Sequence, residues 1–383
     1  MSLRPYRWIT FVFSLNFLIA SAFVLNGCGG RKVVATDPKE LNIPADLAKA
    51  FEVKELPKDA PPTPVTTVAA EKPKKTKRVA SKKAKAQAGV FTIPSRRPEV
   101  DPMWVGEKIW MDVTWLSTKA GEFLLEVLPH KEIDGRKVYN FKGSARTSDL
   151  FSLVYRAEDW VQTFVDFEGW FPYKFVLYGD ETKHIRDHVE LFDHAAKKQY
   201  VHIRDNRIQK NEIVEKKGYE ELTPFSQDAL SAIYYARTFP LKNGDLIKFP
   251  MTSSGKQFDT ELTVMGREEV NTKMGYMKAI KTKVVTRFQN VLQQKGDAFM
   301  WFSDDERRYL LRFEAKVRIG WVAGIARQIE SGQRPETEVV APKSDAHTSA
   351  AQSMATVSGP TGERKTPKRR SWFRHLLKQN ESE

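Results

Sequence analysis

The amino-acid sequence predicts a mainly β fold, which is a curved antiparallel sheet, an open barrel or a sandwich with one covering helix, flanked by disordered tails. Between residues 96 and 331, short segments alternate apolar and polar side chains with a period of two, as half-buried strands do. Turn signals separate these segments at short intervals. Only one stretch has helical spacing, which disfavours a parallel sheet built with alternating helices.

The first strands follow from alternation and from one turn. Apolar side chains alternate with polar ones in Ile109–Trp115 and again in Phe123–Val127. Asp134-Gly135 is a strong hairpin signal, and Tyr139 and Phe141 continue the period of two after it. Further strands are predicted at Trp160–Asp166, Tyr173–Tyr178, Val189–Asp193 and Tyr200–Arg204.

One helix is predicted at Gln227–Arg237, where Leu230, Ile233, Tyr234 and Arg237 share a face. Asn243-Gly244 then marks a turn, and the strand pattern resumes. The later strands are predicted at Phe258–Val264, Ile280–Val284, Ala298–Ser303, Leu311–Val317 and Trp321–Ile329. We expect the helix to cover one face of the sheet.

The remaining chain divides by composition. Residues 1–27 read as a signal peptide, with Arg4 and Arg7 before an apolar stretch from Ile9 to Leu25. Residues 28–95 and 332–383 are rich in small, polar and basic residues, and they bury too little apolar surface to offset chain entropy. We therefore expect a disordered linker, a β-rich domain over 96–331 and a disordered C-terminal tail.

A lipid attachment site is predicted where the apolar stretch ends. Leu25-Asn26-Gly27-Cys28 resembles the lipobox of bacterial lipoproteins, and Cys28 is the one cysteine of the chain. The resemblance implies that Cys28 carries a membrane lipid, and that Gly29 directs the protein to the periplasmic face of the outer membrane. The alternative is an uncleaved apolar helix with an incidental cysteine. The lone thiol excludes an internal disulfide.

Nearly all of the net charge of +14 lies in the two tails. Glu71–Lys85 holds eight basic residues and one acidic residue, a net +7, and Glu363–Lys378 holds seven and one, a net +6. These runs are candidates for binding anionic headgroups or wall polymers, or they are solvated spacers. The export signal disfavours nucleic acid as a partner. The candidate residues are Lys74, Lys75, Lys77, Arg78, Lys82, Lys83, Lys368, Arg369 and Arg370.

An ordered set of segments resembles the bacterial domain-of-unknown-function family 3108. The set comprises VGEKIWMDVTWLSTKAGEF, QDALSAIYYARTFPLKNGD, TKMGYMKAIK and WFSDDERRYLLRFEAKVRIGWVAGI, and it extends from about Trp104 to Ile329. The basic tails lie outside the family pattern. The resemblance implies a fold and an envelope location, but it implies no reaction.

Catalytic signatures are weak in this sequence. It has no Gly-x-Ser-x-Gly elbow, phosphate loop or dinucleotide fingerprint, so we expect no cofactor. His184 and His188 have metal-ligand spacing for a helix, with His194 nearby, but the pattern there is that of a strand or loop, so no metal site is expected. Asp304 and Asp305 are either acid–base groups of a hydrolase or the caps of a hairpin turn.

The aromatic side chains of the domain suggest what it does. Seven tryptophans lie in the β-rich part: Trp104, Trp110, Trp115, Trp160, Trp170, Trp301 and Trp321. Such residues either line a ligand pocket on a curved sheet or fill the core. The leading hypothesis is a non-enzymatic envelope protein that binds an apolar or amphipathic ligand, or a partner protein. A structural tether or assembly factor, bound to anionic polymers through the basic tails, is the alternative.

Overall fold

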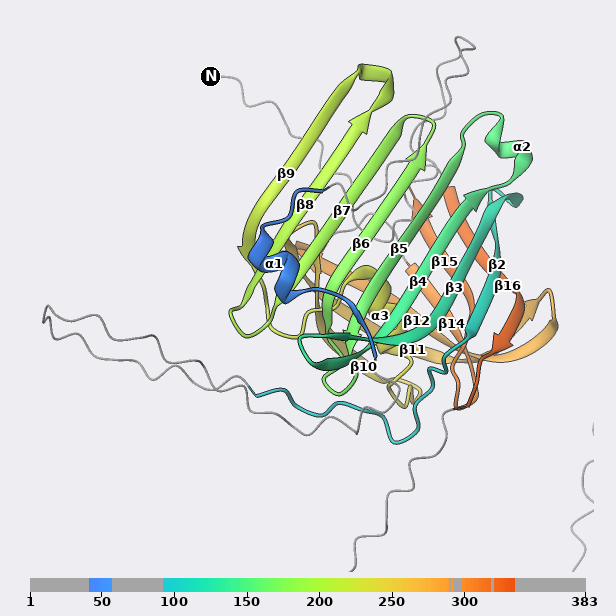
Figure 1. The fold of residues 1–383 in the computed structure, drawn as a ribbon. Helices are drawn as coiled ribbons and strands as arrows, with labels where there is room; N and C mark the ends of the chain where they lie inside the picture. Colours follow the sequence, from blue (N-terminus) through green and yellow to red (C-terminus); the bar gives the residue numbers. More distant parts are fainter. Residues whose placement is uncertain (1–40, 57–91, 289–290, 293–297, 318–319, 335–383) are drawn as a thin grey trace, which may run out of the picture. The chain divides into compact units, whose positions relative to one another are not determined.

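Strands dominate the described part of the chain. The computed structural model describes residues 41–56, 92–288, 291–292, 298–317 and 320–334. Within these residues, one sheet contains all of the strands, and each neighbouring pair is antiparallel (Figure 1). The mainly β, antiparallel fold predicted from the alternating pattern is therefore confirmed.

The sheet has two halves. The first is a meander of β2 (Glu107–Trp115), β3 (Thr118–Ile133), β4 (Arg136–Thr147), β5 (Ala157–Asp166), β6 (Pro172–Glu181), β7 (His184–Asp193), β8 (Lys198–Arg207) and β9 (Glu212–Glu221). The second contains β10 (Leu246–Ser253), β11 (Lys256–Thr272), β12 (Gly275–Phe288), β14 (Ala298–Ser303), β15 (Leu310–Val317) and β16 (Gly320–Ser331). Short β13 (Val291–Leu292) pairs with β12, α2 spans Asp149–Ser152, and a 3-10 turn spans Ile208–Lys210.

The two halves join where β16 pairs with β2, so the last strand lies beside the first strand of the meander. The outer strands are β9 and β10, which do not pair with each other, so the sheet is not closed into a barrel. Side chains of the first half instead bind Ser254, which follows β10 directly. Glu190 on β7 accepts the backbone N–H of Ser254 at 2.8 Å, and Lys216 on β9 donates to the Ser254 carbonyl at 3.0 Å.

Helix α3 (Ala229–Ala236) lies between the two halves and contacts β4, β5 and β10 (Figure 1). Its Tyr234 is fully buried and stacks on Phe141 of β4, with ring centroids 3.8 Å apart. One apolar cluster joins this helix to strands of both halves. The predicted covering helix is confirmed, although it is shorter than Gln227–Arg237 because Gln227 and Asp228 form its N-terminal cap region.

Turn chemistry sets the register of the first hairpin. Strand β3 ends at Ile133 and β4 begins at Arg136, so Asp134 and Gly135 form a two-residue loop. Both residues have positive φ, at 50° and 72°. The backbone twist of such a loop matches the twist of the two strands that the loop joins. The hairpin predicted from Asp134-Gly135 is confirmed.

One segment differs from the expected disordered linker. Residues 41–56 contain α1 (Ala45–Ala50) and β1 (Lys54–Glu55), and β1 pairs with β3. Leu41 is buried, and the segment packs on an apolar patch of β6–β8 that includes Val189, Leu191 and Tyr200. The prediction of disorder is wrong here because four apolar side chains find a partner surface on the sheet. They are Leu41, Ile43, Leu47 and Phe51.

Candidate functional site

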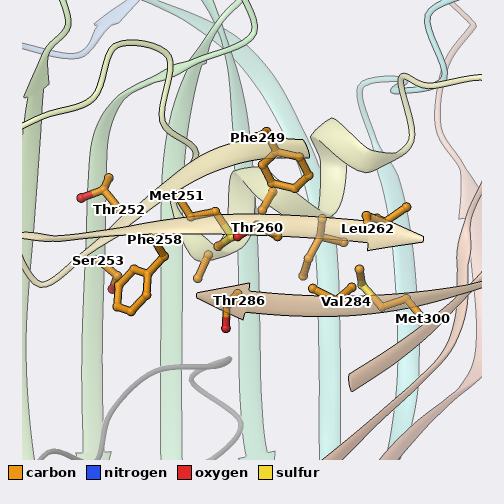
Figure 2. A pocket seen from close by; sticks show the side chains of 13 residues that line it. Phe249, Met251, Thr252, Ser253, Phe258, Thr260, Leu262, Val284, Thr286 and Met300 are labelled. Carbon is orange, nitrogen blue, oxygen red and sulfur yellow. The ribbon is translucent and has the colours of Figure 1, made fainter. Parts of the chain in front are cut away.

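An apolar pocket lies between α3 and strands β10, β11, β12 and β14 (Figure 2). Its free volume is about 40 Å³. One water needs about 10–15 Å³, so the space is larger than one water, and its mostly apolar lining favours a small apolar group. The side chains that line it are Ala229, Ala232, Ile233, Phe249, Met251, Thr252, Ser253, Phe258, Thr260, Leu262, Val284, Thr286 and Met300.

Strand register brings the pocket side chains together. Phe249 on β10 lies opposite Thr260 on β11, and Thr260 lies opposite Thr286 on β12. Residues directly opposite in an antiparallel pair share one face, so this row points toward the helix. Leu262 and Val284 form the next row in the same way. The alternation of the strands therefore builds one continuous wall.

A buried cap fixes the start of α3 above that wall. The Asp228 carboxylate accepts the backbone N–H groups of Leu230 and Ser231, each at 2.8 Å, and the Ser231 hydroxyl accepts the N–H of Asp228. The Thr163 hydroxyl of β5 also donates to Asp228. Burial raises the pKa of Asp228 to about 6, against the opposing effect of these hydrogen bonds. This capping box ties the helix to the first half of the sheet.

The hydroxyl groups that line the pocket differ in whether they have a hydrogen-bond partner. The Thr252 hydroxyl donates to Gln199 at 2.8 Å. The Thr260 hydroxyl is buried and has no hydrogen-bond partner among the residues that the structure describes. Since an unsatisfied buried hydroxyl costs stability, Thr260 is a source of instability in this wall.

The predicted lipid and anion sites lie outside the described residues. These are Cys28 with Leu25, Asn26 and Gly27, and both basic runs, Lys74–Lys83 and Lys368–Arg370. They remain predictions. Within the described part of the chain, no helix has the length and apolarity that a membrane span requires.

Asp304 and Asp305 are both exposed in the turn between β14 and β15. Asp305 accepts the backbone N–H groups of Arg307 and Arg308, each at 2.9 Å, and Asp304 pairs with Arg267 at 3.1 Å. The turn interpretation is confirmed. The hydrolase alternative required both carboxylates in a cleft, and their positions do not support it.

The three histidines occupy separate environments. His184 and His188 lie on β7, next to Asp205 at 3.0 Å and Glu190 at 2.9 Å respectively. His194 donates from Nε2 to the Pro172 carbonyl and accepts the Phe225 N–H at Nδ1, and burial lowers its pKa to about 4. Among the described residues, no group of His, Cys, Asp or Glu has an arrangement that would hold a metal ion.

The tryptophans divide between core and surface. Trp170 and Trp301 are buried, whereas Trp321 is 41% exposed. Trp110 and Trp160 are half-buried, and they face away from α3. None of the seven lines the pocket, so the aromatic content did not locate it. The spacing of Ile247, Phe249 and Met251 at every second position was the signal that would have identified β10 as its wall.

Glu181 is a buried titratable group, as Asp228 is, and it lies at the other end of β5 and β6. The Glu181 side chain is buried, and the Tyr155 hydroxyl donates to it. Burial raises the pKa of Glu181 to about 9, and the nearby Asp159 carboxylate adds to that rise. Burial likewise raises the pKa of Asp159 to about 7. Neither residue was singled out from the sequence, because their proximity depends on strand register.

Comparison with known proteins identifies a family. The model of a family described as proteins of unknown function, DUF3108, matches residues 111–324, more than half of the 383-residue chain. Comparison with curated proteins gives no match.

Three solved structures are similar to this chain. A beta-barrel-like protein of the domain of unknown function DUF1849 from Brucella abortus shares 11% identity with a TM-score of 0.38, covering 59% of this chain and 98% of that one. A candidate lipoprotein from Parabacteroides distasonis shares 10% identity with a TM-score of 0.26, covering 63% and 100%. A candidate exported protein with a YmcC-like fold from Bacteroides fragilis shares 11% identity with a TM-score of 0.24, covering 59% and 96%.

Proposed function

Because the chain belongs to the DUF3108 family, whose description gives no function, we propose from the pocket itself that the domain binds the apolar part of an amphipathic ligand between α3 and β10–β12. The almost wholly apolar lining of this pocket carries the proposal. Burial of a hydrocarbon group there gains about 25 cal/mol for each Å² removed from water. The pocket offers binding chemistry and no catalytic set, so the proposed role is non-enzymatic.

The size of the pocket limits what enters it. A volume of about 40 Å³ accepts the end of an acyl chain or one apolar side chain, but not a whole lipid. Met251 and Met300 line the space, and their unbranched side chains repack at low cost. The ligand we propose therefore inserts its apolar end and leaves its polar part outside the pocket, in contact with water.

The proposed location is the cell envelope, at the periplasmic face of the outer membrane. The lipobox-like segment Leu25–Cys28 supports it, together with the signal-like stretch before it. A lipid on Cys28 would hold the domain near membranes, where molecules with acyl chains are abundant. In this proposal the tether and the pocket serve one task, which is to hold an amphipathic molecule at the envelope.

Filling the pocket tests the proposal. In the Ala229→Phe variant the new ring occupies part of the small pocket that Ala229 lines, so the affinity for an acyl probe is expected to fall at least tenfold. The probe is decanoic acid, which has a free methyl end, titrated into the full-length chain in isothermal titration calorimetry. Ala323→Phe is the matched control, because Ala323 is a half-buried residue of β16 that does not line the pocket. This variant should bind the probe as the wild type does. A wild-type chain that binds no probe, or equal affinities in both variants, contradicts the proposal.

Thr260 gives a stability prediction for the same wall. Thr260→Val keeps the side-chain volume and removes an unsatisfied buried hydroxyl, so the free energy of unfolding is expected to rise by about 1 kcal/mol. Thr282→Val is the control, because the Thr282 hydroxyl donates to the Met300 carbonyl at 3.0 Å and its loss should destabilise the protein. Urea unfolding, followed by circular dichroism, measures both. Destabilisation of the Thr260 variant would show that its hydroxyl is satisfied.

A further inference from the structure

A second and larger cavity lies on the outer face of β2–β6, on the side of the sheet opposite α3. Phe141 stacks on Tyr234 of the helix, so the adjacent Lys142 points to the other face of β4. Ser144, two residues on, shares that outer face. The cavity is an open groove of about 430 Å³, within the range of about 300–1,000 Å³ that ligand sites occupy.

One cross-strand row forms the floor and ends of this groove. The register places Trp110 opposite Leu124, Leu124 opposite Ser144, Ser144 opposite Trp160, and Trp160 opposite Tyr178. All five residues line the groove. Aromatic rings therefore stand at both ends, on β2 and on β5–β6, with the small Ser144 between them.

The spacing of the row defines a long platform. Trp110 and Trp160 lie three strands apart, which corresponds to about 14 Å between their backbones. The rings of Trp160 and Tyr178 are 6.3 Å apart and tilted by 30°. The Lys142 ammonium lies 5.7 Å from the Trp160 ring. The groove thus offers flat apolar surfaces at a separation that a short chain of linked rings spans.

Polar groups of both signs surround these aromatic surfaces. Arg327 pairs with Glu122 at 2.6 Å along one side, and Arg156 pairs with Asp180 at 2.6 Å near the other end. This balance favours neither a polyanion nor a polycation. The Tyr178 side chain is only 7% exposed, so the half-buried Trp110 and Trp160 offer the larger stacking surfaces.

We propose that this outer groove binds an oligosaccharide of linked pyranose rings. A pyranose presents an apolar C–H face, which stacks on Trp and Tyr, and polar hydroxyls at its edge, which pair with carboxylate, guanidinium and hydroxyl groups. An acyl chain would leave the charged walls unpaired, and a charged polymer would meet like charges on either side. The groove is separate from the pocket beneath α3, so the two binding activities are independent.

The test uses the full-length chain and two neutral probes, hexa-N-acetylchitohexaose and cellohexaose, in isothermal titration calorimetry. At least one probe is expected to bind the wild type. Trp110→Ala and Trp160→Ala should each weaken that binding at least tenfold, because each removes one stacking surface. Trp321→Ala, at an exposed tryptophan outside the groove, is the matched control and should stay within twofold of the wild type.

A second variant keeps the test valid if loss of a tryptophan unfolds the sheet. Ser144→Tyr fills the floor of the groove and retains both tryptophans, and it should also abolish binding. Ala229→Phe, which blocks the other pocket, should leave glycan binding unchanged, so failure of one site is distinguishable from failure of the other. The absence of binding to both probes, or equal binding in wild type and groove variants, would overturn the proposal.

Discussion

Replacing Arg237 with Met is expected to lower the free energy of unfolding by about 3–5 kcal/mol, because it leaves the buried Glu107 carboxylate without its main partner. Both side chains are 1% exposed. The guanidinium forms two bonds to Glu107, at 2.6 Å and 2.9 Å, and also donates to the carbonyls of Pro102 and Arg307. Arg307 is the only other cation that bonds to Glu107 within the described residues, at 2.7 Å.

The position of Arg237 makes the effect larger than that of an ordinary ion pair. Arg237 follows α3 directly and ties its end to β2, whereas Asp228 ties its beginning to β5. Loss of Arg237 therefore frees one end of the helix that covers the pocket. We expect the variant to bind the acyl probe more weakly as well as to unfold more easily.

A double variant separates the unpaired charge from the lost packing. Arg237→Met combined with Glu107→Gln removes both charges, so its stability should exceed that of Arg237→Met alone. Urea unfolding, followed by circular dichroism, gives both values. A loss below about 1 kcal/mol in the single variant would show that Arg307 and water compensate fully for the missing guanidinium.

Local patterns were sufficient to predict the fold class and most elements. The hairpin at Asp134-Gly135, the helix near Leu230–Tyr234 and the alternating strands all depend on residues close in sequence. Strand β9 was missed because Glu212–Glu221 is polar on both faces, as suits an edge strand that buries little. The pairing of β16 with β2 was not predictable, since no local pattern specifies a contact between strands about 200 residues apart.

The candidate sites required knowledge of register. Trp110 and Trp160 carry no sign in the sequence that they share a row, and a shift of one residue would turn either ring toward the core. Residues 41–56 were mispredicted for a related reason. The four apolar side chains of that segment are too sparse to form a core of their own, and they became ordered only through the surface that β6–β8 present.

The wild-type protein is expected to lose stability as the pH rises from about 5 to 9, because Glu181 is a buried carboxyl with a raised pKa. Its ordinary value is 4.5, and burial, with the charge of Asp159, raises the pKa to about 9. Between these values the native state binds more protons than the unfolded state, so the free energy of unfolding falls as pH increases. Since each pKa unit corresponds to about 1.4 kcal/mol, the expected loss between pH 5 and 9 is roughly 5 kcal/mol.

Several groups face Glu181 and shape this response. Asp159 on β5, whose pKa burial raises to about 7, repels the Glu181 carboxylate when it is charged. Asp205 on β8 acts in the same direction, and Arg186 on β7 opposes both. The Tyr155 hydroxyl donates to Glu181 and favours its charged form. Burial is nevertheless the largest cause, because the side chain is 2% exposed and no cation forms a direct ion pair with it among the described residues.

Glu181→Gln isolates this contribution, because glutamine keeps the shape of the protonated acid and does not titrate. The variant should match the wild type near pH 5 and become the more stable of the two at pH 9. Glu158→Gln, on the exposed end of β5, is the control and should follow the wild-type curve. Thermal unfolding at pH 5, 7 and 9 measures all three proteins. Parallel curves for wild type and Glu181→Gln would mean that Glu181 ionises at its ordinary pKa, and that water reaches this end of the sheet.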